Sequence, residues 1–360
     1  MESASDGNCK LVEMESKSGD NTANISEPDE VCKTVVSVGT DRSGKLCPTY
    51  RKSLPPFLAA AADGDIGILR QYIDAHIQEE DGNSSHCNDK INNNVQAEDR
   101  RIQHIKDLIS CRDRKGSTAE HWSAGGGHIA CLSYLLELRD IVSATESNQS
   151  TSESADTSNA DGEAVSANNS SDKTFQSQTK IRRRRDGKTC LHYASRNGHI
   201  SCIKLLLSRP DAPSVDIRSG DGTTPLHLAC YGGHPSSVRM LIEAGADVSA
   251  TNDWECGCAH WTAMSLGNEG MDSVIELCEF LKGCGVDFCK SQRQGHSPLH
   301  KAASKRNRDV IEWLAGKRFT EEERKKMGEP DKCGNVPSDI WLSVGGDPEF
   351  ASWMKVSLGW

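Results

Sequence analysis

The residues of this sequence best suited to chemistry are two thiols and an imidazole that lie close together. Cys256, Cys258 and His260 fall within five residues, and thiolate and imidazole groups are good zinc ligands, four of which close a structural site. The fourth ligand would be Cys284 or Cys289. The spacing differs from the ligand pairs usual for zinc. Packing is therefore the preferred interpretation, and we predict no bound metal and no other cofactor.

The sequence also lacks the common catalytic motifs. It has no glycine-rich loop followed by Lys and Ser or Thr, no nucleophile elbow and no HExxH segment. The glycines of residues 125–128 (GGGH) close an expected helix, whereas a phosphate-binding loop must open one and direct backbone amides at the anion. Fifteen cysteines and twelve histidines yield Cys–His pairs by chance. We therefore predict that the protein is not an enzyme.

One dense basic run, KIRRRR, lies between a Ser/Thr-rich stretch and a strong repeat. Such runs serve as nuclear-import signals, and phosphorylation of the flanking Ser and Thr residues could neutralise this one. Alternatively, Arg184 and Arg185 align with a loop, where they would form a solvated turn or dock an acidic partner. The residues of the import hypothesis are Lys180, Arg182, Arg183, Arg184 and Arg185.

A motif that recurs along the chain would position these residues. Three copies share a Thr or small residue before a helix, a His within it and a closing Gly-His: residues 116–128, 187–199 and 222–234. The step from His192 to His227 is 35 residues, and the step from His227 to His260 is 33, as in helix-pair solenoids. More divergent copies occur at 56–65, 255–263, 295–303 and 334–341.

The copy at residues 222–248 shows why the units must stack. Thr224 is placed to cap the first helix, which Gly233 closes, and Gly245 ends a second helix with one apolar face. A lone pair would leave that face in water, at roughly 1.5–3 kcal/mol for each large side chain. Neighbouring pairs therefore have to cover each other.

These units resemble ankyrin repeats, most clearly at 113–136, 186–207 and 219–248, and the resemblance covers residues 55–360 apart from inserts. It implies an all-α solenoid of six or seven stacked helix pairs, with loop fingers projecting sideways and the first helices lining a concave surface. It also implies that the repeated His bonds backbone groups of neighbouring loops. That position is held by His121, His192, His227, His260 and His300, and His128, His199 and His234 follow the closing Gly.

Departures from the repeat predict further elements. The 40-residue step from His260 to His300 indicates a lengthened second helix over 271–282. Thr320 with Glu323 is a capping-box signature that predicts a short helix at 320–327. Residues 331–360, which include Trp341, Phe350 and Trp353, are expected to form a C-terminal capping unit. Four apolar residues at helical spacing are expected to pack on the first unit: Ile102, Ile105, Leu108 and Ile109.

Three polar stretches show no apolar periodicity, namely residues 1–54, about 77–96 and about 143–179. They cannot bury enough apolar surface to offset the entropy of ordering. We expect a disordered acidic N-terminal tail and two disordered inserts.

Charge and composition restrict the partners. A formal charge of -10 gives no general attraction to nucleic acid or anionic lipid, and no apolar run is long enough to span a bilayer. No targeting peptide is visible, and the scattered cysteines suit a reducing compartment. We expect a monomer in the cytoplasm, with entry into the nucleus as the alternative.

The resemblance implies a non-catalytic scaffold or adaptor that binds another protein through the concave face and the loop fingers. Large aromatic and Arg side chains are enriched in interfaces, and the predicted contacts are Trp122, Tyr193, Arg196, Tyr231 and Trp261. Alternatively, these side chains fill gaps between adjacent units. A nucleocytoplasmic regulatory adaptor imported through the basic run is the second hypothesis, and a zinc-stabilised module is the third.

Overall fold

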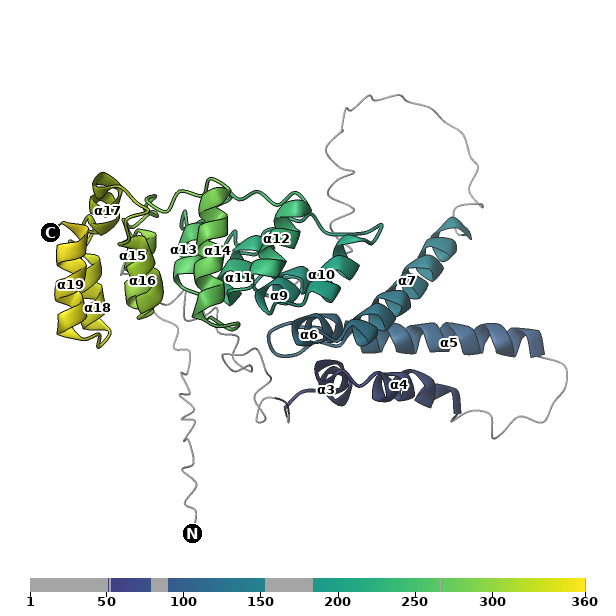
Figure 1. Cartoon of the computed structure of the whole chain (residues 1–360). Helices are drawn as coiled ribbons and strands as arrows, with labels where there is room; N and C mark the ends of the chain where they lie inside the picture. Colours follow the sequence, from purple (N-terminus) through teal and green to yellow (C-terminus); the bar gives the residue numbers. More distant parts are fainter. Residues whose placement is uncertain (1–50, 52, 79–89, 153–183, 266, 360) are drawn as a thin grey trace, which may run out of the picture. The chain divides into compact units, whose positions relative to one another are not determined.

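The computed structural model describes residues 51, 53–78, 90–152, 184–265 and 267–359 (Figure 1). Over these residues the chain forms sixteen helices and no strand. The predicted all-α class is confirmed. No helix in these ranges combines the length and the apolar character needed to cross a membrane.

Fourteen of these helices form seven successive pairs, here called units 1 to 7. In each pair the second helix packs on the first. The pairs are α3 (Pro56–Asp63) with α4 (Ile66–Gln78), α6 (Ala119–Gly126) with α7 (Ile129–Ser152), α9 (Cys190–Arg196) with α10 (Ile200–Leu207), α11 (Pro225–Gly232) with α12 (Pro235–Glu243), α13 (Cys258–Ala263) with α14 (Met271–Gly283), α15 (Pro298–Ser304) with α16 (Arg308–Leu314), and α18 (Pro337–Ser343) with α19 (Pro348–Leu358).

Each unit covers its neighbour, as the apolar faces require. The first helix of every unit contacts the first helix of the next, and the second helices do so from unit 1 to unit 6. Apolar side chains line these contacts, among them Leu226, Val238 and Leu241 of unit 4, each fully buried. Stacking therefore supplies the burial that an isolated pair would lack.

Two helices lie outside the pairs, α5 (Lys90–Ser110) and α17 (Glu321–Gly328). Helix α17 begins with the predicted capping box: the backbone N–H of Thr320 donates to Glu323 Oε2 (2.7 Å), and the N–H of Glu323 donates to Thr320 Oγ1 (3.2 Å). The lengthened second helix of unit 5 is also present, as α14.

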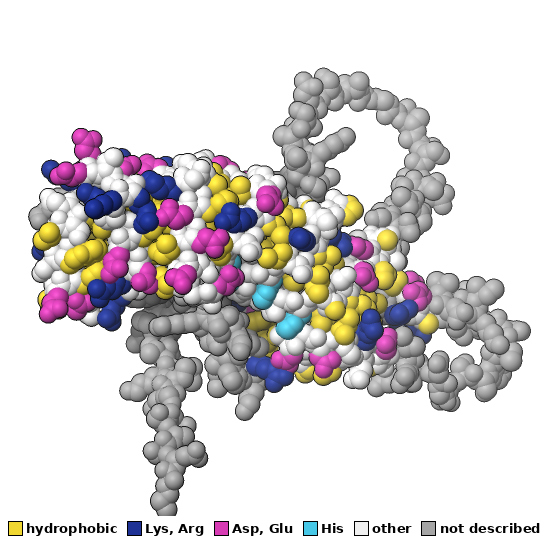
Figure 2. Space-filling model, viewed as in Figure 1, with side chains coloured by type: hydrophobic (Ala, Val, Ile, Leu, Met, Phe, Trp, Pro, Cys, Tyr) yellow, Lys and Arg dark blue, Asp and Glu magenta, His cyan; other side chains and the backbone are white. Residues whose placement is uncertain are grey.

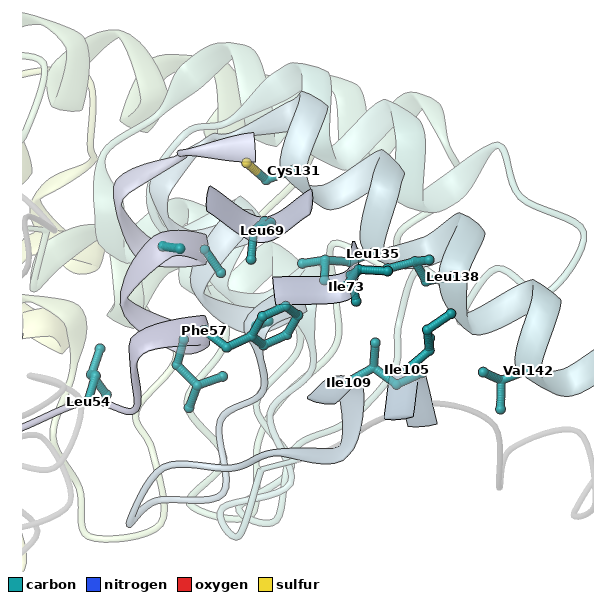
Figure 3. Packing of buried hydrophobic residues seen from close by; sticks show 14 residues of the cluster. Leu54, Phe57, Leu69, Ile73, Ile105, Ile109, Cys131, Leu135, Leu138 and Val142 are labelled. Carbon is teal, nitrogen blue, oxygen red and sulfur yellow. The ribbon is translucent and has the colours of Figure 1, made fainter. Parts of the chain in front are cut away.

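Helix α5 packs against α4 and α7 and closes the core of the first two units. Its Ile105 and Ile109 are buried, as the helical spacing predicts, while Ile102 and Leu108 are partly buried beside them. Figure 3 shows the buried cluster that they join, which includes Leu54, Phe57, Leu69, Ile73, Cys131, Leu135, Leu138 and Val142.

The structure moves the boundaries of the predicted inserts. Helix α5 already begins at Lys90, and α7 continues to Ser152, so residues 90–96 and 143–152 are helical where disorder was expected. The two helices pack on each other along this extension: Val142 of α7 is buried in the same cluster as Ile105 and Ile109 of α5, and Lys106 Nζ lies 2.5 Å from Glu146 Oε1 on the surface. Helix α4 also runs to Gln78, inside the first predicted insert, and Leu54, at the end of the predicted tail, is buried in the cluster of unit 1. Residues 79–89 and 153–179 of the inserts, and residues 1–50 and 52 of the tail, lie outside the described residues.

The last unit is held by aromatic packing. Trp341 and Phe350 are both buried, with ring centroids 4.8 Å apart. Trp353 stacks on Phe350 at 4.9 Å and stays 40% exposed. The aromatic residues expected in the capping unit thus divide into two that form its interior and one that remains on its surface.

Candidate functional site

The repeated histidines connect each first helix to the following loop. Because a carbonyl oxygen only accepts, each ring must donate through Nε2–H. A neutral ring can then accept at Nδ1, whereas a protonated ring cannot. Four such bonds are His192 to Thr223 (3.0 Å), His227 to Ala250 (2.9 Å), His260 to His296 (3.1 Å) and His300 to Asn335 (3.2 Å).

The other ring nitrogen of each histidine, Nδ1, accepts a hydrogen bond from the backbone N–H of the N-cap residue of its own helix. The backbone N–H of Thr224 donates to His227 Nδ1 at 3.1 Å, and Thr118, Thr189, Gly257 and Ser297 donate to their histidines in the same way. Burial is the main cause that lowers the pKa of His121 and His260 to about 3, and of His227 and His300 to about 4. These rings therefore stay uncharged at neutral pH.

The second set of histidines packs on the end of the preceding unit. His199 Nε2 lies 2.9 Å from the carbonyl oxygen of Gly125, and its ring rests on Gly127, where a Cβ atom would come within 2.5 Å of Nδ1. Gly127 also has φ +76, a conformation that other residues adopt at a cost. His128 makes the equivalent bond to Ala62 (3.0 Å).

Six loops, here called fingers 2 to 7 after the unit that each precedes, share one hairpin geometry. In finger 2 the N–H of Asp113 donates to the carbonyl oxygen of Ser117 (3.0 Å), and the N–H of Gly116 donates to that of Asp113 (2.9 Å). The same pair of bonds occurs in all six fingers. The fingers span 113–118, 184–189, 219–224, 252–257, 292–297 and 331–336.

Backbone hydrogen bonds also join the tip of each finger to the next. In each case a backbone N–H at the tip donates to a carbonyl oxygen of the preceding finger at 2.9–3.2 Å. The five bonds run from Arg185 to Lys115, from Gly220 to Asp186, from Asp253 to Asp221, from Arg293 to Trp254 and from Lys332 to Gln294. The bond from Arg185 to Lys115 links fingers 2 and 3, which are 70 residues apart at these positions in the sequence. The tip side chains are thereby held at fixed spacing.

Finger 5 departs from the others at its turn. Five fingers place a glycine with positive φ at the fourth position: Gly116, Gly187, Gly222, Gly295 and Gly334. Finger 5 has Glu255 there, with φ 65, next to the half-buried Trp254. A β-carbon in this region is disfavoured, so finger 5 carries local backbone strain.

The structure divides the five predicted partner contacts, Trp122, Tyr193, Arg196, Tyr231 and Trp261, into two groups. These five residues are here called the contact row. Arg196, Tyr231 and Trp261 are 6%, 3% and 2% exposed. The Trp261 ring stacks on His227 (centroids 6.1 Å apart) and meets Tyr231 edge-on (5.9 Å), while the Arg196 guanidinium lies 5.8 Å from the Tyr231 ring. Contacts between units thus occupy these three side chains and leave them little surface for a partner.

The other two members of the row are half-buried. Trp122 packs beside the cluster of unit 1, and Tyr193 meets His121 edge-on at 6.2 Å. The guanidinium of Arg184 lies 5.1 Å from the centre of the Tyr193 ring. Trp122 and Tyr193, on the adjacent first helices of units 2 and 3, therefore retain exposed surface.

The basic run is partly built into finger 3. Residues 180–183 lie outside the described part of the chain. Arg184 donates its backbone N–H to the carbonyl oxygen of Lys188 (2.9 Å), and its side chain is 7% exposed. Arg185 is exposed at the tip. An import receptor that required Arg184 would have to displace it from its site on Tyr193.

The proposed zinc ligands have other contacts. His260 uses both ring nitrogens in the bonds described above, and the thiol of Cys258 contacts Cys230, a hydrogen bond that, with burial, raises its pKa well above the ordinary range. In the ranges that the structure covers, no three His, Cys, Asp or Glu side chains come together as metal ligands.

Stacked helix pairs, bridging histidines and a continuous row of fingers define a helix-pair repeat protein. A family model described as ankyrin repeats, in three copies, matches residues 155–252. The chain is an ankyrin-repeat protein. Among solved structures, the ankyrin repeat domain of human ASB11 is similar, with 15% identity, a TM-score of 0.48 and coverage of 84% of this chain and 98% of that one. The comparison with curated proteins found no match.

Sequence reasoning missed the basic residues in and next to finger 2, which are Arg112, Arg114 and Lys115. Asp113 interrupts them, so they do not read as a basic run. The signal that could have found them is the alignment of the repeats, which places this loop next to finger 3.

Proposed function

We propose that the chain is a non-catalytic scaffold or adaptor that binds a partner protein through the first helices and fingers of units 2 and 3. Ankyrin repeats are in general protein-interaction modules. The observation that carries the proposal is the exposed surface of Trp122 and Tyr193 on adjacent helices, in contrast to the buried remainder of the row.

The bonded fingers support the same location. A surface that binds tightly loses little freedom on association when its side chains are already positioned. The backbone bonds hold fingers 2 and 3 in one arrangement, and Arg184 of finger 3 lies 5.1 Å from the centre of the Tyr193 ring. Large aromatic side chains on such a support are the usual anchors of protein interfaces.

The test is affinity capture from a cell lysate with the full chain as bait, followed by mass spectrometry. A bait with Trp122→Ala and Tyr193→Ala should lose a protein that the unmodified bait retains. The matched control is Ile129→Ser, which removes an apolar side chain that is 44% exposed on a second helix. Circular dichroism must show all baits folded. Equal recovery on all three baits would contradict the proposal.

A further inference from the structure

Fingers 2 and 3 carry a concentration of positive charge. The stretches 112–118 and 184–189 hold six cationic side chains and only two carboxylates. Over the face shown in Figure 2, by contrast, basic and acidic side chains are interspersed. The six cations are Arg112, Arg114, Lys115, Arg184, Arg185 and Lys188, here called the basic patch.

Both carboxylates are already engaged. Asp113 is buried and accepts the backbone N–H groups of Lys115 (2.9 Å) and Ser117 (2.7 Å). Asp186 lies 3.2 Å from Lys188 Nζ and 3.6 Å from Arg184. Within the described part of the chain, neither Arg114 nor Arg185 has an ion pair, and both are exposed. The excess of positive charge therefore faces solvent.

The two fingers bring these cations together. The N–H of Arg185 donates to the carbonyl oxygen of Lys115 at 3.2 Å, and the Arg185 Cγ atom would lie 3.3 Å from a Cβ placed on Gly116. Burial, and then the charge of Arg184, lowers the pKa of Lys115. Like charges held this close repel one another, and a bound anion would relieve that repulsion.

The next two fingers have the opposite charge, which limits the kind of anion. Arg218 is the single cation there, among five carboxylates in or beside fingers 4 and 5: Asp216, Asp221, Asp247, Asp253 and Glu255. A long polyanion that followed the bonded tips would meet these carboxylates, whereas a short acidic segment would not. This arrangement favours an acidic stretch of protein over a nucleic acid.

We infer that fingers 2 and 3 bind a short acidic segment of the partner protein, with its carboxylates on Arg114, Lys115 and Arg185. The inference rests on the proposed function and specifies the chemistry of the partner. Arginine suits this role because its planar guanidinium pairs with a carboxylate through two hydrogen bonds.

The test measures binding of a short fluorescein-labelled polyglutamate peptide by fluorescence anisotropy, with a polyglutamine peptide of equal length as the uncharged probe. The full chain should bind polyglutamate only, and less tightly as salt rises. Arg114→Glu with Arg185→Glu should weaken binding at least about tenfold. The control, Arg293→Glu with Lys332→Glu, reverses two charges at exposed tips of fingers 6 and 7, where Arg293 lies 3.7 Å from Glu255, and should leave binding within about twofold.

Three outcomes would overturn the inference: no binding of polyglutamate, equal loss in both double variants, or tighter binding of a single-stranded oligonucleotide that Arg114→Glu with Arg185→Glu abolishes. The capture experiment separates this failure from that of the proposed function. If polyglutamate does not bind but capture still depends on Trp122 and Tyr193, only the acidic partner is wrong. If polyglutamate binds as expected but capture is the same on every bait, only the proposed function is wrong.

Discussion

Units 2 and 3 differ from units 4 and 5 in how they use the same repeat positions. Trp122 and Trp261 both follow the repeat histidine directly. Trp261 is enclosed by His227 and Tyr231 of unit 4. Trp122 packs against the core cluster of unit 1 and stays partly exposed. In unit 1 the much smaller Ala62 stands at the repeat position of Tyr231, two residues before the closing glycine. The size of the neighbouring side chains therefore decides whether this position serves packing or remains on the surface.

The fingers of the two regions differ in charge as well. Fingers 2 and 3 are basic and fingers 4 and 5 are acidic, although their backbone bonds are the same. The backbone of the repeat sets the spacing, and the tip residues are free to vary. The charge of the finger tips therefore differs from one region of the stack to the next, although the repeat backbone is the same.

The largest difference is expected between the two tryptophans. Trp261→Ala removes a fully packed ring and should lower the free energy of unfolding by about 3–5 kcal/mol, whereas Trp122→Ala should cost about half of that or less. Urea denaturation followed by circular dichroism measures both. Equal losses would show that the two positions have the same packing role and would remove the distinction between the regions.

The ion pairs that join neighbouring units are more buried between units 2 and 3 than between units 4 and 5. Arg139 joins units 2 and 3 because it lies 2.5 Å from Asp211 and 3.7 Å from the buried carboxylate of Glu120. Arg139→Met leaves that carboxylate without its cation and should cost about 3 kcal/mol in the same denaturation experiment. Between units 4 and 5, Glu276 pairs with Arg239 at 2.9 Å on the surface, and Glu276→Gln should cost less than about 1 kcal/mol. A cost for Arg139→Met no larger than that of the surface variant would contradict the burial argument.

Acid should weaken both regions through their histidines. The folded pKa is about 3 for His121 and about 4 for His227, while the unfolded value is near 6.5. The unfolded chain therefore binds more protons between these limits, and the stability present above pH 6.5 is lost as pH falls. Each histidine lowers the free energy of unfolding by up to about 1.4 kcal/mol for each pH unit below 6.5. The loss amounts to about 2 kcal/mol for each histidine at pH 5.

Substitution of single histidines shows how much of this pH dependence comes from unit 2 and how much from unit 4. His121→Asn and His227→Asn should each lower the number of protons taken up on unfolding by about half a proton at pH 6.5 and by up to about one proton at pH 5. Denaturation series at several pH values give the slope independently of the stability that each substitution removes. If His121→Asn leaves the slope unchanged, the repeat histidine of unit 2 is not held neutral as burial requires.

The smallest effect is expected at the finger turns. Glu255→Gly should relieve the strain of a positive φ in finger 5 and stabilise the chain by about 1 kcal/mol. Gly187→Ala in finger 3 should destabilise it by at least as much, because its φ is +76 and the new Cβ would lie 2.5 Å from the backbone nitrogen of Gly220. Thermal unfolding by calorimetry resolves both. A loss of stability in Glu255→Gly would mean that the glutamate side chain outweighs the strain.

The sequence by itself determined the elements that depend on nearby residues. The capping box at Thr320, the extended helix α14 and the repeat histidines all rest on hydrogen bonds or apolar spacing within a few positions, and each is visible in the printed letters. Such interactions are local, so their geometry follows from residue type and separation.

Only the tertiary structure decided which surfaces remain. Burial of Tyr231 and Trp261 depends on what the adjacent unit presents, and the contact of Arg185 with Lys115 joins two loops separated by the whole of α7 and the stretch after it. The length of α7 likewise depends on its partner α5. Packing between distant segments sets these features, because the exposure of a side chain is a property of its neighbours in space and not of its neighbours in the chain.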